Sequence, residues 1–505
     1  MARTIHEIIA SGKADAVALS APGRAPMTYS ALATQIEQTV DGMNARGIGR
    51  NERVAIVLSN GPEMATAFLA IAAGATTAPL NPAYRGEEYD FYLSDLNAKA
   101  LVVERGSNSP ALAVAKKRHI PILEIEWSDE DPAGTFRFCG EAASAGVANG
   151  GYADPEDGGL VLHTSGTTSR PKIVPLSQAN ICASAEHIKN TLNLQASDKC
   201  LNIMPLFHIH GLIAAVLSSI RSGASICCAT GFNALKFFSW LEEADPTWYT
   251  AVPTMHQVIL TRADRNAAII ENSNLRLVRS SSAALPPQVM AELENTFGCP
   301  VIEAYGMTEA AHQMASNPLP NAPRKPGSVG LAAGPEVAIM DTDGNILTSG
   351  EVGEIVIKGP NVFAGYEANP EANAKAFSGE WFRTGDQGII DQDGYIILTG
   401  RLKEIINRGG EKISPSEVDE VLMDHEAVQQ VVSFALPHEK LGEEVAAVVV
   451  LKEGAAAEEK ELRDFAAGRL ADFKVPRTIL FKDEIPKGAT GKLQRIGLAE
   501  KLGLV

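Results

Sequence analysis

The chain has 505 residues, a formal net charge of −17, and 45% hydrophobic and 21% charged residues. This length exceeds what one hydrophobic core usually holds, so we expect two or more domains, and the composition excludes disorder over any large part of the chain. The acidic balance argues against nucleic-acid and anionic-membrane partners, although an acidic surface is also explained by solubility alone.

The cysteines and the two ends of the chain bear on the compartment. The six cysteines include no C-x-x-C pair and have no companion histidines at zinc spacing, so we expect no structural metal and a reducing environment. The N-terminal stretch lacks a continuous apolar segment, and “AEKLGLV” at the end carries no targeting tripeptide. The longest apolar run, “GLIAAVLSSI” before Arg221, predicts a buried helix and not a membrane span. We therefore expect a cytoplasmic protein.

The first half of the chain alternates strand-like and helix-like segments. From Arg53, “RVAIVLSNGPEMATAFLAIAAGATTAPLNP” predicts a strand, a helix with Pro62 near its start, and a short strand ending at Pro79. The alternation recurs in “GLVLHTSGTT” followed by “SQANICASAEHIKNTL”, in “WYTAVPTMHQVIL”, and in “LRLVRSSSAALPPQVMAELENTFGCPVIEAYG”. It predicts an α/β fold with doubly wound parallel sheets, whose ligands gather beyond the carboxyl ends of the strands.

A polar loop follows one of these strands. The segment from His163 to Lys172 reads “HTSGTTSRPK” and is too rich in hydroxyls and charge to belong to a core. Its hydroxyls, backbone amides and two cations suit a phosphate cradle, in which the glycine allows close approach to the ligand. A solvated surface loop is the alternative for this segment taken alone.

The second half of the chain changes character. Shorter strands, “EVAIMDTDGNIL”, “GEIVIKG” and “GYIILTGR”, are separated by turn residues and predict a hairpin-rich β subdomain that ends near Gly400. Beyond it, about 100 residues of alternating helix and strand suffice for a small α+β domain. We therefore predict an N-terminal domain over residues 1–400 and a C-terminal domain over residues 401–505, with the boundary at Arg401 to Lys403.

Four more segments carry chemistry: “YGMTEAAH” from Tyr305, “WFRTGD” ending at Asp386, “GRLKEIINRGGEKISPSEVDE” from Gly400, and “PKGATGKLQR” from Pro486. An aromatic residue before Gly-x-Thr-Glu could stack on a base and place a carboxylate on Mg²⁺. An aspartate after Thr-Gly could accept from ribose hydroxyls, and a lysine after Gly-x-x-Gly could reach an anion. Each segment is weak alone, but their order is specific.

In this order the segments resemble those of the adenylate-forming superfamily of acyl-CoA synthetases, adenylation domains and firefly luciferases, over essentially the whole chain. The resemblance implies ATP, Mg²⁺ and coenzyme A as cofactors. Ser169 departs from the glycine that most members have, and Ile173 also departs from many of them. The implied site is a nucleotide site, a mobile lysine and a hinge.

The resemblance implies a role for each matching residue. The phosphate loop comprises Thr164, Ser165, Gly166, Thr167, Thr168 and Lys172. Tyr305 stacks on adenine, Thr308 binds a phosphate oxygen, and Glu309 is both catalytic and the Mg²⁺ ligand. Asp386 and Arg401 bind the ribose, and the nucleotide site also includes Ser282, Ala283, Glu303 and Ala304. Lys492 is the catalytic lysine of the first half-reaction. Lys403 is the hinge about which the small domain swings, so that Gly409 and Gly410 admit the pantetheine arm.

Polar residues also mark the acid pocket. His208 and His210 lie in “MPLFHIHG”, Arg279, Ser280 and Ser282 in “VRSSSAAL”, and His312 in “TEAAHQM”. Such donors suit a small acid with a second carboxylate better than a long-chain or aromatic acid, whose pocket would be apolar. Any one of these histidines is equally explained as a structural residue. Alternation along a strand would place Ser280 and Ser282 on one face.

Several segments, including “HTSGTTSRPK” with its Ser169, resemble more closely the oxalate-CoA ligases of plants and fungi. That resemblance implies that Ser282 and His312 hold oxalate with His208 and His210 in support, although the choice between Ser280 and Ser282 stays open. The expected activity is an AMP-forming acid–thiol ligase that makes oxalyl-CoA from oxalate, ATP and CoA, as a monomer or homodimer.

Three other hypotheses stay open. The chain could be a CoA ligase for malonate or a short-chain acid, or a stand-alone adenylation enzyme that loads a carrier protein. A catalytically inactive nucleotide-binding protein is disfavoured, because Glu309 and Lys492 are both present.

Overall fold

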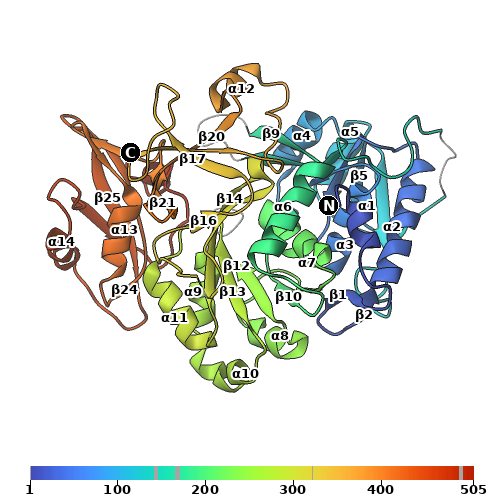
Figure 1. The fold of residues 1–505 in the computed structure, drawn as a ribbon, viewed down its shortest axis with the longest axis horizontal. Helices are drawn as coiled ribbons and strands as arrows, with labels where there is room; N and C mark the ends of the chain where they lie inside the picture. The colour runs from blue at the N-terminus through green and yellow to red at the C-terminus, as the bar shows by residue number, and fades with distance from the viewer. Residues whose placement is uncertain (1, 142–145, 165–170, 321, 488–492) are drawn as a thin grey trace.

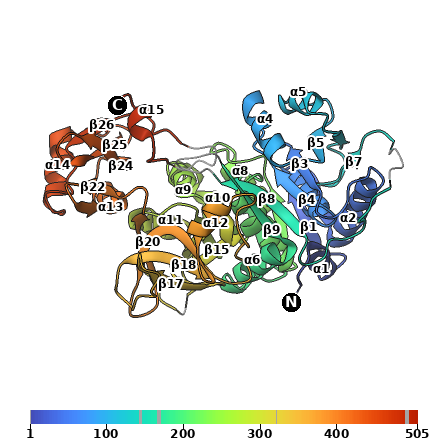
Figure 2. The ribbon, with the colours of Figure 1, turned by 90° about the horizontal axis from the view of Figure 1, so that it is seen from above.

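The computed structural model describes residues 2–141, 146–164, 171–320, 322–487 and 493–505. Within them the strands form four sheets (Figure 1). Two large sheets and a smaller β-sheet belong to the first 401 residues, and the fourth sheet lies in the C-terminal part of the chain. Figure 2 shows this C-terminal part to one side of the rest.

The first large sheet has seven strands, and its central strands are parallel. In spatial order they are β7 (Arg137–Phe138), β6 (Ile122–Glu126), β5 (Ala100–Glu104), β3 (Arg53–Val57), β4 (Thr76–Pro79), β8 (Gly158–Thr164) and β9 (Lys172–Ser177). Both edge strands, β7 and β9, pair antiparallel with their neighbours.

The second large sheet has nine strands and is parallel from β1 to β14. Its order is β16 (Leu331–Ala332), β15 (His312–Ser316), β14 (Val301–Met307), β13 (Leu277–Ser281), β12 (Trp248–Ala251), β10 (Lys199–Asn202), β11 (Ser225–Cys228), β1 (Val17–Ala21) and β2 (Arg24–Thr28). The carboxyl ends of β13 and β14 lead into the predicted acid and nucleotide motifs.

Helices cover the two large sheets. Those packed between the sheets include α3 (Pro62–Ala72), α6 (Gln178–Thr191), the π-helix η1 (His210–Leu217) and α7 (Ser218–Arg221). Every residue of α3 is buried, as expected for a helix that contacts β8 on one sheet and β1 and β11 on the other. Ser177 caps α6 by accepting from the Asn180 amide, in a capping box with the Asn180 side chain.

The outer helices complete the N-terminal part. They are α1 (Ile5–Ala10), α2 (Tyr29–Asn44), α4 (Gly86–Asp95), α5 (Ala111–Lys117), α8 (Phe237–Ala244), α9 (Pro253–Leu260), the 3₁₀ turn η2 (Asp264–Asn266), α10 (Ala267–Glu271) and α11 (Pro287–Phe297). Apolar residues of α8, α9 and α11 join β10, β12, β13 and β14 in one core cluster, and those of α4 and α5 join β3, β5 and β8 in another.

The two smaller sheets follow in the chain. The β subdomain contains β17 (Glu336–Met340), β18 (Gly353–Lys358), β19 (Phe377–Ser378), β20 (Trp381–Ile390) and β21 (Ile396–Arg401), with α12 (Pro370–Ala376). The last sheet contains β22 (Ile406–Arg408), β23 (Glu411–Ile413), β24 (Val428–His438), β25 (Gly442–Leu451) and β26 (Thr478–Phe481), with α13 (Pro415–Met423), α14 (Glu459–Ala467) and α15 (Leu498–Lys501). Gln257 of α9 contacts this last unit through the Gln429 carbonyl and the Gln430 side chain.

The fold class predicted from the sequence is confirmed, and most predicted elements are present. The strand, helix and strand expected from Arg53 to Pro79 are β3, α3 and β4. One strand, β9, was not predicted: it pairs antiparallel with β8, and Lys172 at its start lies opposite Thr164. The domain division at residues 400 and 401 stays a prediction.

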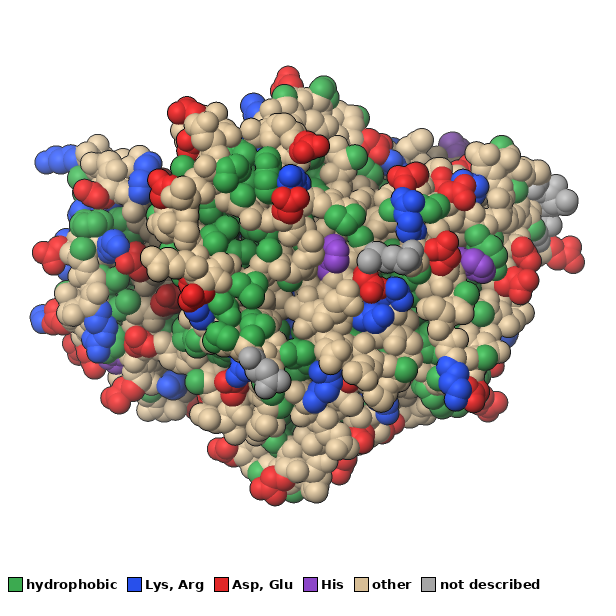
Figure 3. Space-filling view, viewed as in Figure 1, with side chains coloured by type: hydrophobic (Ala, Val, Ile, Leu, Met, Phe, Trp, Pro, Cys, Tyr) green, Lys and Arg blue, Asp and Glu red, His purple; other side chains and the backbone are tan. Residues whose placement is uncertain are grey.

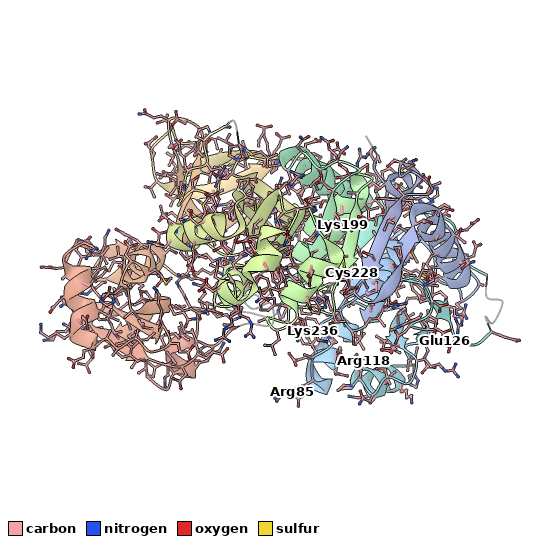
Figure 4. The ribbon with its side chains drawn as sticks, turned by 90° about the horizontal axis from the view of Figure 1, so that it is seen from below. Arg85, Arg118, Glu126, Lys199, Cys228 and Lys236 are labelled. Carbon is pink, nitrogen blue, oxygen red and sulfur yellow. The ribbon has the colours of Figure 1, made fainter. Side chains whose placement is uncertain are left out.

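The interior and the surface agree with the composition. All six cysteines are unpaired and five are buried; Figure 4 shows Cys228 inside the molecule, with Arg85, Arg118 and Glu126 toward its periphery. On the face in Figure 3, acidic and basic side chains are interspersed. None of the helices formed by the described residues is long and apolar enough to span a membrane.

Candidate active site

The two described ends of the predicted phosphate loop, Thr164 and Lys172, are paired in the β8–β9 ladder. The Lys172 ammonium is 4.2 Å from the centroid of the Tyr366 ring. Burial lowers the pKa of Lys172, and the positive charge of Lys403 lowers it further, whereas Glu309 acts in the opposite direction. The pairing therefore brings Lys172 toward Lys403, the predicted hinge, and toward Glu309, the predicted metal ligand.

Six residues of the predicted site lie outside the described residues: Ser165, Gly166, Thr167, Thr168, Ser169 and Lys492.

Glu309 is held by its own short element. It lies in the 3₁₀ turn η3 (Thr308–Ala310) directly after β14, and its side chain is 5% exposed. The Tyr366 hydroxyl donates to Glu309 Oε1 at 2.8 Å, and the Phe363 amide donates to the Glu309 carbonyl at 2.8 Å. Burial raises the pKa of Glu309; the Tyr366 hydrogen bond and the charges of Lys172 and Arg401 oppose that rise.

Glu309 fits the kind of site that Mg²⁺ uses with nucleotides. Among the described residues, no three His, Cys, Asp or Glu side chains gather as an all-protein metal site. Mg²⁺ is usually held by one or two carboxylates together with substrate phosphates, so one carboxylate near the phosphate loop matches that chemistry.

Tyr305, Asp386 and Arg401 form a second polar group. The buried Tyr305 of β14 donates its hydroxyl to Asp386 Oδ2. The β20–β21 register places Asp386 opposite Arg401, whose Nε is 3.2 Å from Asp386 Oδ1. Burial raises the pKa of Asp386, and the Arg401 charge opposes it. The structure thus joins the predicted adenine residue to the two predicted ribose residues, of which Asp386 lies 81 positions further along the chain and Arg401 lies beyond it.

The predicted acid residues converge at the end of β13. His210, the first residue of η1, has Nδ1 3.0 Å from Ser282 Oγ and Nε2 2.6 Å from Thr250 Oγ1. The His312 ring lies edge-on to the His210 ring, with 5.0 Å between centroids. His208 Nδ1 accepts from the His210 amide at 3.3 Å. Three segments that are remote in sequence therefore meet at one polar cluster.

The geometry distinguishes Ser282 from Ser280. Ser280 is fully buried in β13, and its hydroxyl has no hydrogen-bond partner among the described residues. Ser282 lies beyond the strand end at Ser281, is half-buried, and contacts His210. The strand alternation assumed from the sequence thus stops before Ser282, and it is Ser282 whose hydroxyl contacts the His210 ring.

Backbone strain accompanies this cluster. Ser282 has φ +77°, and Ala311 and His312 have φ +47° and +105°. Residues other than glycine rarely adopt positive φ, and such strain concentrates at functional sites. Gly306 explains how β14 and β15 approach one another here: a Cβ atom at Gly306 would lie 1.8 Å from the His312 carbonyl oxygen.

Other predicted residues have structural contacts. Glu303 is buried; its Oε1 accepts from the Leu285 amide at 2.8 Å, and burial raises its pKa to about 8. Ala304 is buried and paired with Ser281, Ala283 is exposed, and Thr308 is half-buried at the start of η3.

The predicted hinge and the predicted glycine pair lie in the C-terminal part. Lys403 is exposed just after β21. Gly409 and Gly410 form the turn between β22 and β23 with φ +61° and +102°, so the turn itself requires glycine-like backbone. Arg495 joins this region through ion pairs with Glu404, at 3.5 Å, and with Asp419.

Some neighbours of the site were not assigned roles from the sequence. Tyr366, Thr250 and Gln313 contact predicted residues that are far away in the chain. A pocket of about 320 Å³ also opens beside Pro205–Phe207, lined mainly by apolar residues such as Leu58, Met64 and Leu80. Its lining does not include His210, Ser282 or His312.

Comparison with known proteins defines the class. Residues 7–367 match the family described as “AMP-binding enzyme”, and residues 417–492 match the family described as “AMP-binding enzyme C-terminal domain”. Oxalate–CoA ligase of Arabidopsis thaliana is 45% identical, over 97% of this chain and 96% of the relative; the yeast Saccharomyces cerevisiae oxalate–CoA ligase is 41% identical, over 89% and 87%. Sulfoacetate–CoA ligase of Cupriavidus necator is 33% identical, over 94% and 92%. ATP-bound MatB of Rhodopseudomonas palustris has a TM-score of 0.87 at 27% identity, over 99% of both chains.

The chain belongs to the AMP-binding enzyme family. Within it, the protein is an ATP-dependent acid–CoA ligase that uses ATP, Mg²⁺ and coenzyme A, as predicted.

Proposed function

We propose that this ligase converts oxalate, ATP and CoA into oxalyl-CoA, AMP and diphosphate. The observation that carries the proposal is the polar cluster of His210, Ser282 and His312, with the buried cation of Arg279 behind it. Burying a second carboxylate is costly unless donors or charge meet it, and these side chains are of that kind. The two oxalate–CoA ligases among the relatives support the same acid.

The nucleotide residues receive roles on the same basis. Thr164, Ser165, Gly166, Thr167, Thr168 and Lys172 would hold the β- and γ-phosphates. Tyr305 would stack on adenine, with Asp386 and Arg401 on the ribose, and the Tyr305–Asp386 hydrogen bond supports this grouping. Thr308 would bind a phosphate oxygen and Glu309 would hold Mg²⁺, which when bound offsets phosphate charge.

The chemistry proceeds in two steps. An oxygen of one oxalate carboxylate attacks the α-phosphorus of ATP; the new O–P bond forms as the bond to diphosphate breaks, giving an acyl-adenylate. Lys492 would stabilise the negative charge that develops in this step. The CoA thiolate then attacks the acyl carbon, and AMP leaves with the electron pair of the C–O bond.

The two steps place different demands on the C-terminal part. We propose that residues 401–505 form a domain that turns about Lys403, withdrawing Lys492 and presenting the turn of Gly409 and Gly410 to the pantetheine arm. The exposure of Lys403 and of both glycines is compatible with this role. A cytoplasmic monomer or homodimer stays our prediction for the state of the enzyme.

Sulfoacetate is a second acid to compare directly with oxalate. Sulfoacetate, named for the Cupriavidus necator relative, also has two carbons and a second anionic group. The same side chains would donate to a sulfonate, so the cluster restricts the class of acid more firmly than its identity.

The test is AMP formation by the purified enzyme with a panel of acids, with and without CoA. We expect CoA-dependent turnover with oxalate well above that with sulfoacetate, malonate, acetate, octanoate or coumarate. Equal or faster turnover with any of these would overturn the oxalate assignment, and thioester formed only on a carrier protein would overturn CoA as acceptor.

A further inference from the structure

Arg279 is a buried cation that pairs with no acidic side chain in the described part of the chain. It lies on β13 in the middle of the nine-stranded sheet, and its side chain is 0% exposed. Among the described residues, no Asp or Glu side chain forms an ion pair with its guanidinium. Burial lowers its pKa to about 9, so the group stays charged at neutral pH. An unpaired buried charge costs stability, which a purely structural residue would avoid.

The guanidinium contacts the acid cluster from behind. Arg279 Nη1 lies 3.5 Å from His210 Nε2 and 3.5 Å from Thr250 Oγ1. Arg279 Nη2 lies 3.4 Å from Gln313 Oε1. His210 continues the series, because its Nε2 contacts Thr250 Oγ1 and its Nδ1 contacts Ser282 Oγ. Arg279 is therefore linked through His210 to the residue that we assign to the acid.

The guanidinium indicates the direction of these hydrogen bonds. Because it only donates, Thr250 Oγ1 and His210 Nε2 both accept from Arg279, and an unprotonated Nε2 also accepts the Thr250 hydroxyl proton. A proton on Nε2 would also face the Arg279 charge at 3.5 Å. The neutral imidazole then carries its proton on Nδ1 and donates to Ser282 Oγ. The Ser282 hydroxyl is left to donate onward to an anion.

We propose that Arg279 is a positioning residue that sets the His210 tautomer and aims the donors of His210 and Ser282 at the second anionic group of the acid. Its charge also favours a doubly charged acid over a monocarboxylate, because Coulomb attraction is strong in a poorly solvated interior. This inference rests on the proposed function for the substrate preference, whereas the tautomer is a property of the unliganded protein.

The first experiment compares oxalate with glyoxylate, which has the same carbon number but lacks the second charge. For Arg279→Met we expect the oxalate-to-glyoxylate ratio of kcat/KM to fall about tenfold or more, mainly through KM for oxalate, with KM for ATP unchanged. Arg279→Lys should recover part of the ratio. A ratio unchanged in Arg279→Met, or equal losses for both acids, would overturn the proposal.

Arg276→Met is the matched control. Arg276 lies just before β13 on the same segment, but its guanidinium pairs with Asp198 at 2.6 Å instead of facing His210. Its loss should lower stability and leave the acid ratio unchanged, and a ratio that falls as much as in Arg279→Met would count against the proposal. If Arg279→Met does not fold, Thr250→Val removes the hydroxyl between Arg279 and His210, and the same fall in the ratio is expected.

A second readout does not depend on turnover. In protein labelled with ¹⁵N-histidine, with His210 assigned through His210→Gln, we expect a protonated Nδ1 and an unprotonated Nε2 above pH 7.5, and a shift away from this tautomer in Arg279→Lys or Thr250→Val. A protonated Nε2 in the wild type would overturn the positioning role. If the wild type does not use oxalate, the proposed function fails, and this measurement still decides the role of Arg279.

Discussion

Tyr366 contacts both charges that flank the predicted phosphate site: its hydroxyl donates to Glu309 at 2.8 Å, and the Lys172 ammonium lies 4.2 Å from its ring centroid. The ring lies 57 positions beyond Glu309 in the chain and reaches it from the β subdomain side. One aromatic side chain thus couples the predicted metal ligand to the phosphate-loop lysine.

Tyr366→Phe keeps the ring and removes only the donor. Burial already raises the pKa of Glu309, and the Tyr366 hydroxyl opposes that rise. Without the hydroxyl the pKa of Glu309 rises further, so less carboxylate is ionised at a given acidic pH. We expect the acidic limb of the kcat/KM profile to move to higher pH, with partial recovery by added Mg²⁺.

The matched control is Tyr395→Phe, which removes a hydroxyl that donates to the Pro323 carbonyl. It should leave the acidic limb in place. An acidic limb that stays fixed in Tyr366→Phe would contradict the role assigned to this hydrogen bond.

Asp386→Asn should weaken ATP binding selectively. The side chain keeps its size but loses the charge that faces Arg401, at 3.2 Å, and that accepts from Tyr305. Hydrogen bonds to a charged group contribute about 1.5–3 kcal/mol, so KM for ATP should rise roughly 10- to 100-fold. KM for the acid should change little.

Asp391→Asn is the control for the same β subdomain, where Asp391 pairs with Lys325 at 2.6 Å. Both Michaelis constants should stay near wild type. Equal increases in KM for ATP and for the acid in Asp386→Asn would point to a general distortion and against ribose binding.

The sequence was most informative where chemistry and periodicity coincide locally. The β3–α3–β4 unit and the strand–helix–strand around α11 were predicted because each is a single run of hydrophobic pattern with Pro near the helix start. Strand β9 was missed because Pro175 interrupts its pattern; as an edge strand, β9 can tolerate a residue that donates no backbone hydrogen bond.

The residues of the candidate site were likewise predictable only where a local motif marks them. Motif residues such as Glu309 and Asp386 could be singled out from spacing, but their partners are set by tertiary packing. Thr250 and Gln313 meet His210 and Arg279 across gaps of 40 and 34 positions, and no local pattern marks them. The choice between Ser280 and Ser282 depended on where β13 ends, which a pattern of alternation does not give.

Gly306→Ala should damage the predicted acid site by displacing His312, without replacing any of its polar side chains. The added Cβ would lie 1.8 Å from the His312 carbonyl oxygen and 2.6 Å from His312 Nδ1, so β15 must move. We expect KM for the acid to rise more than KM for ATP, measured by AMP formation.

Gly86→Ala provides the control, because a Cβ there meets nothing within 4 Å. It should behave as wild type. If Gly306→Ala also retains wild-type KM for the acid, the close approach of the two strands does not shape the acid site.

Asp198→Asn tests a stabilising ion pair away from the site. Burial opposes ionisation of Asp198, but hydrogen bonds from Arg276, Gln195 and Thr247 outweigh it and lower the pKa. Such a carboxylate stabilises the fold above its unfolded pKa of about 3.9 and loses that contribution as pH falls through the folded value. We expect the variant to unfold at a lower urea concentration at pH 7, with a free energy of unfolding about 1–3 kcal/mol below that of the wild type. This difference in free energy should shrink below pH 4. A pH-independent difference would contradict the assignment.

Lys492→Ala should separate the two half-reactions. A cation that meets charge developing at the α-phosphate contributes mainly in that transition state, and losing one such preorganised group typically slows the step by about 10²–10³-fold. Thioester formation from added oxalyl-adenylate should slow far less, because Lys492 would be withdrawn in that step.

Lys487→Ala is the control from the same segment, where Lys487 pairs with the exposed Glu484 at 3.3 Å. Both half-reactions should keep their rates in this variant. Adenylation at the wild-type rate in Lys492→Ala would remove the basis for a mobile catalytic lysine, and equal slowing of both steps would place the lysine in a shared structural role.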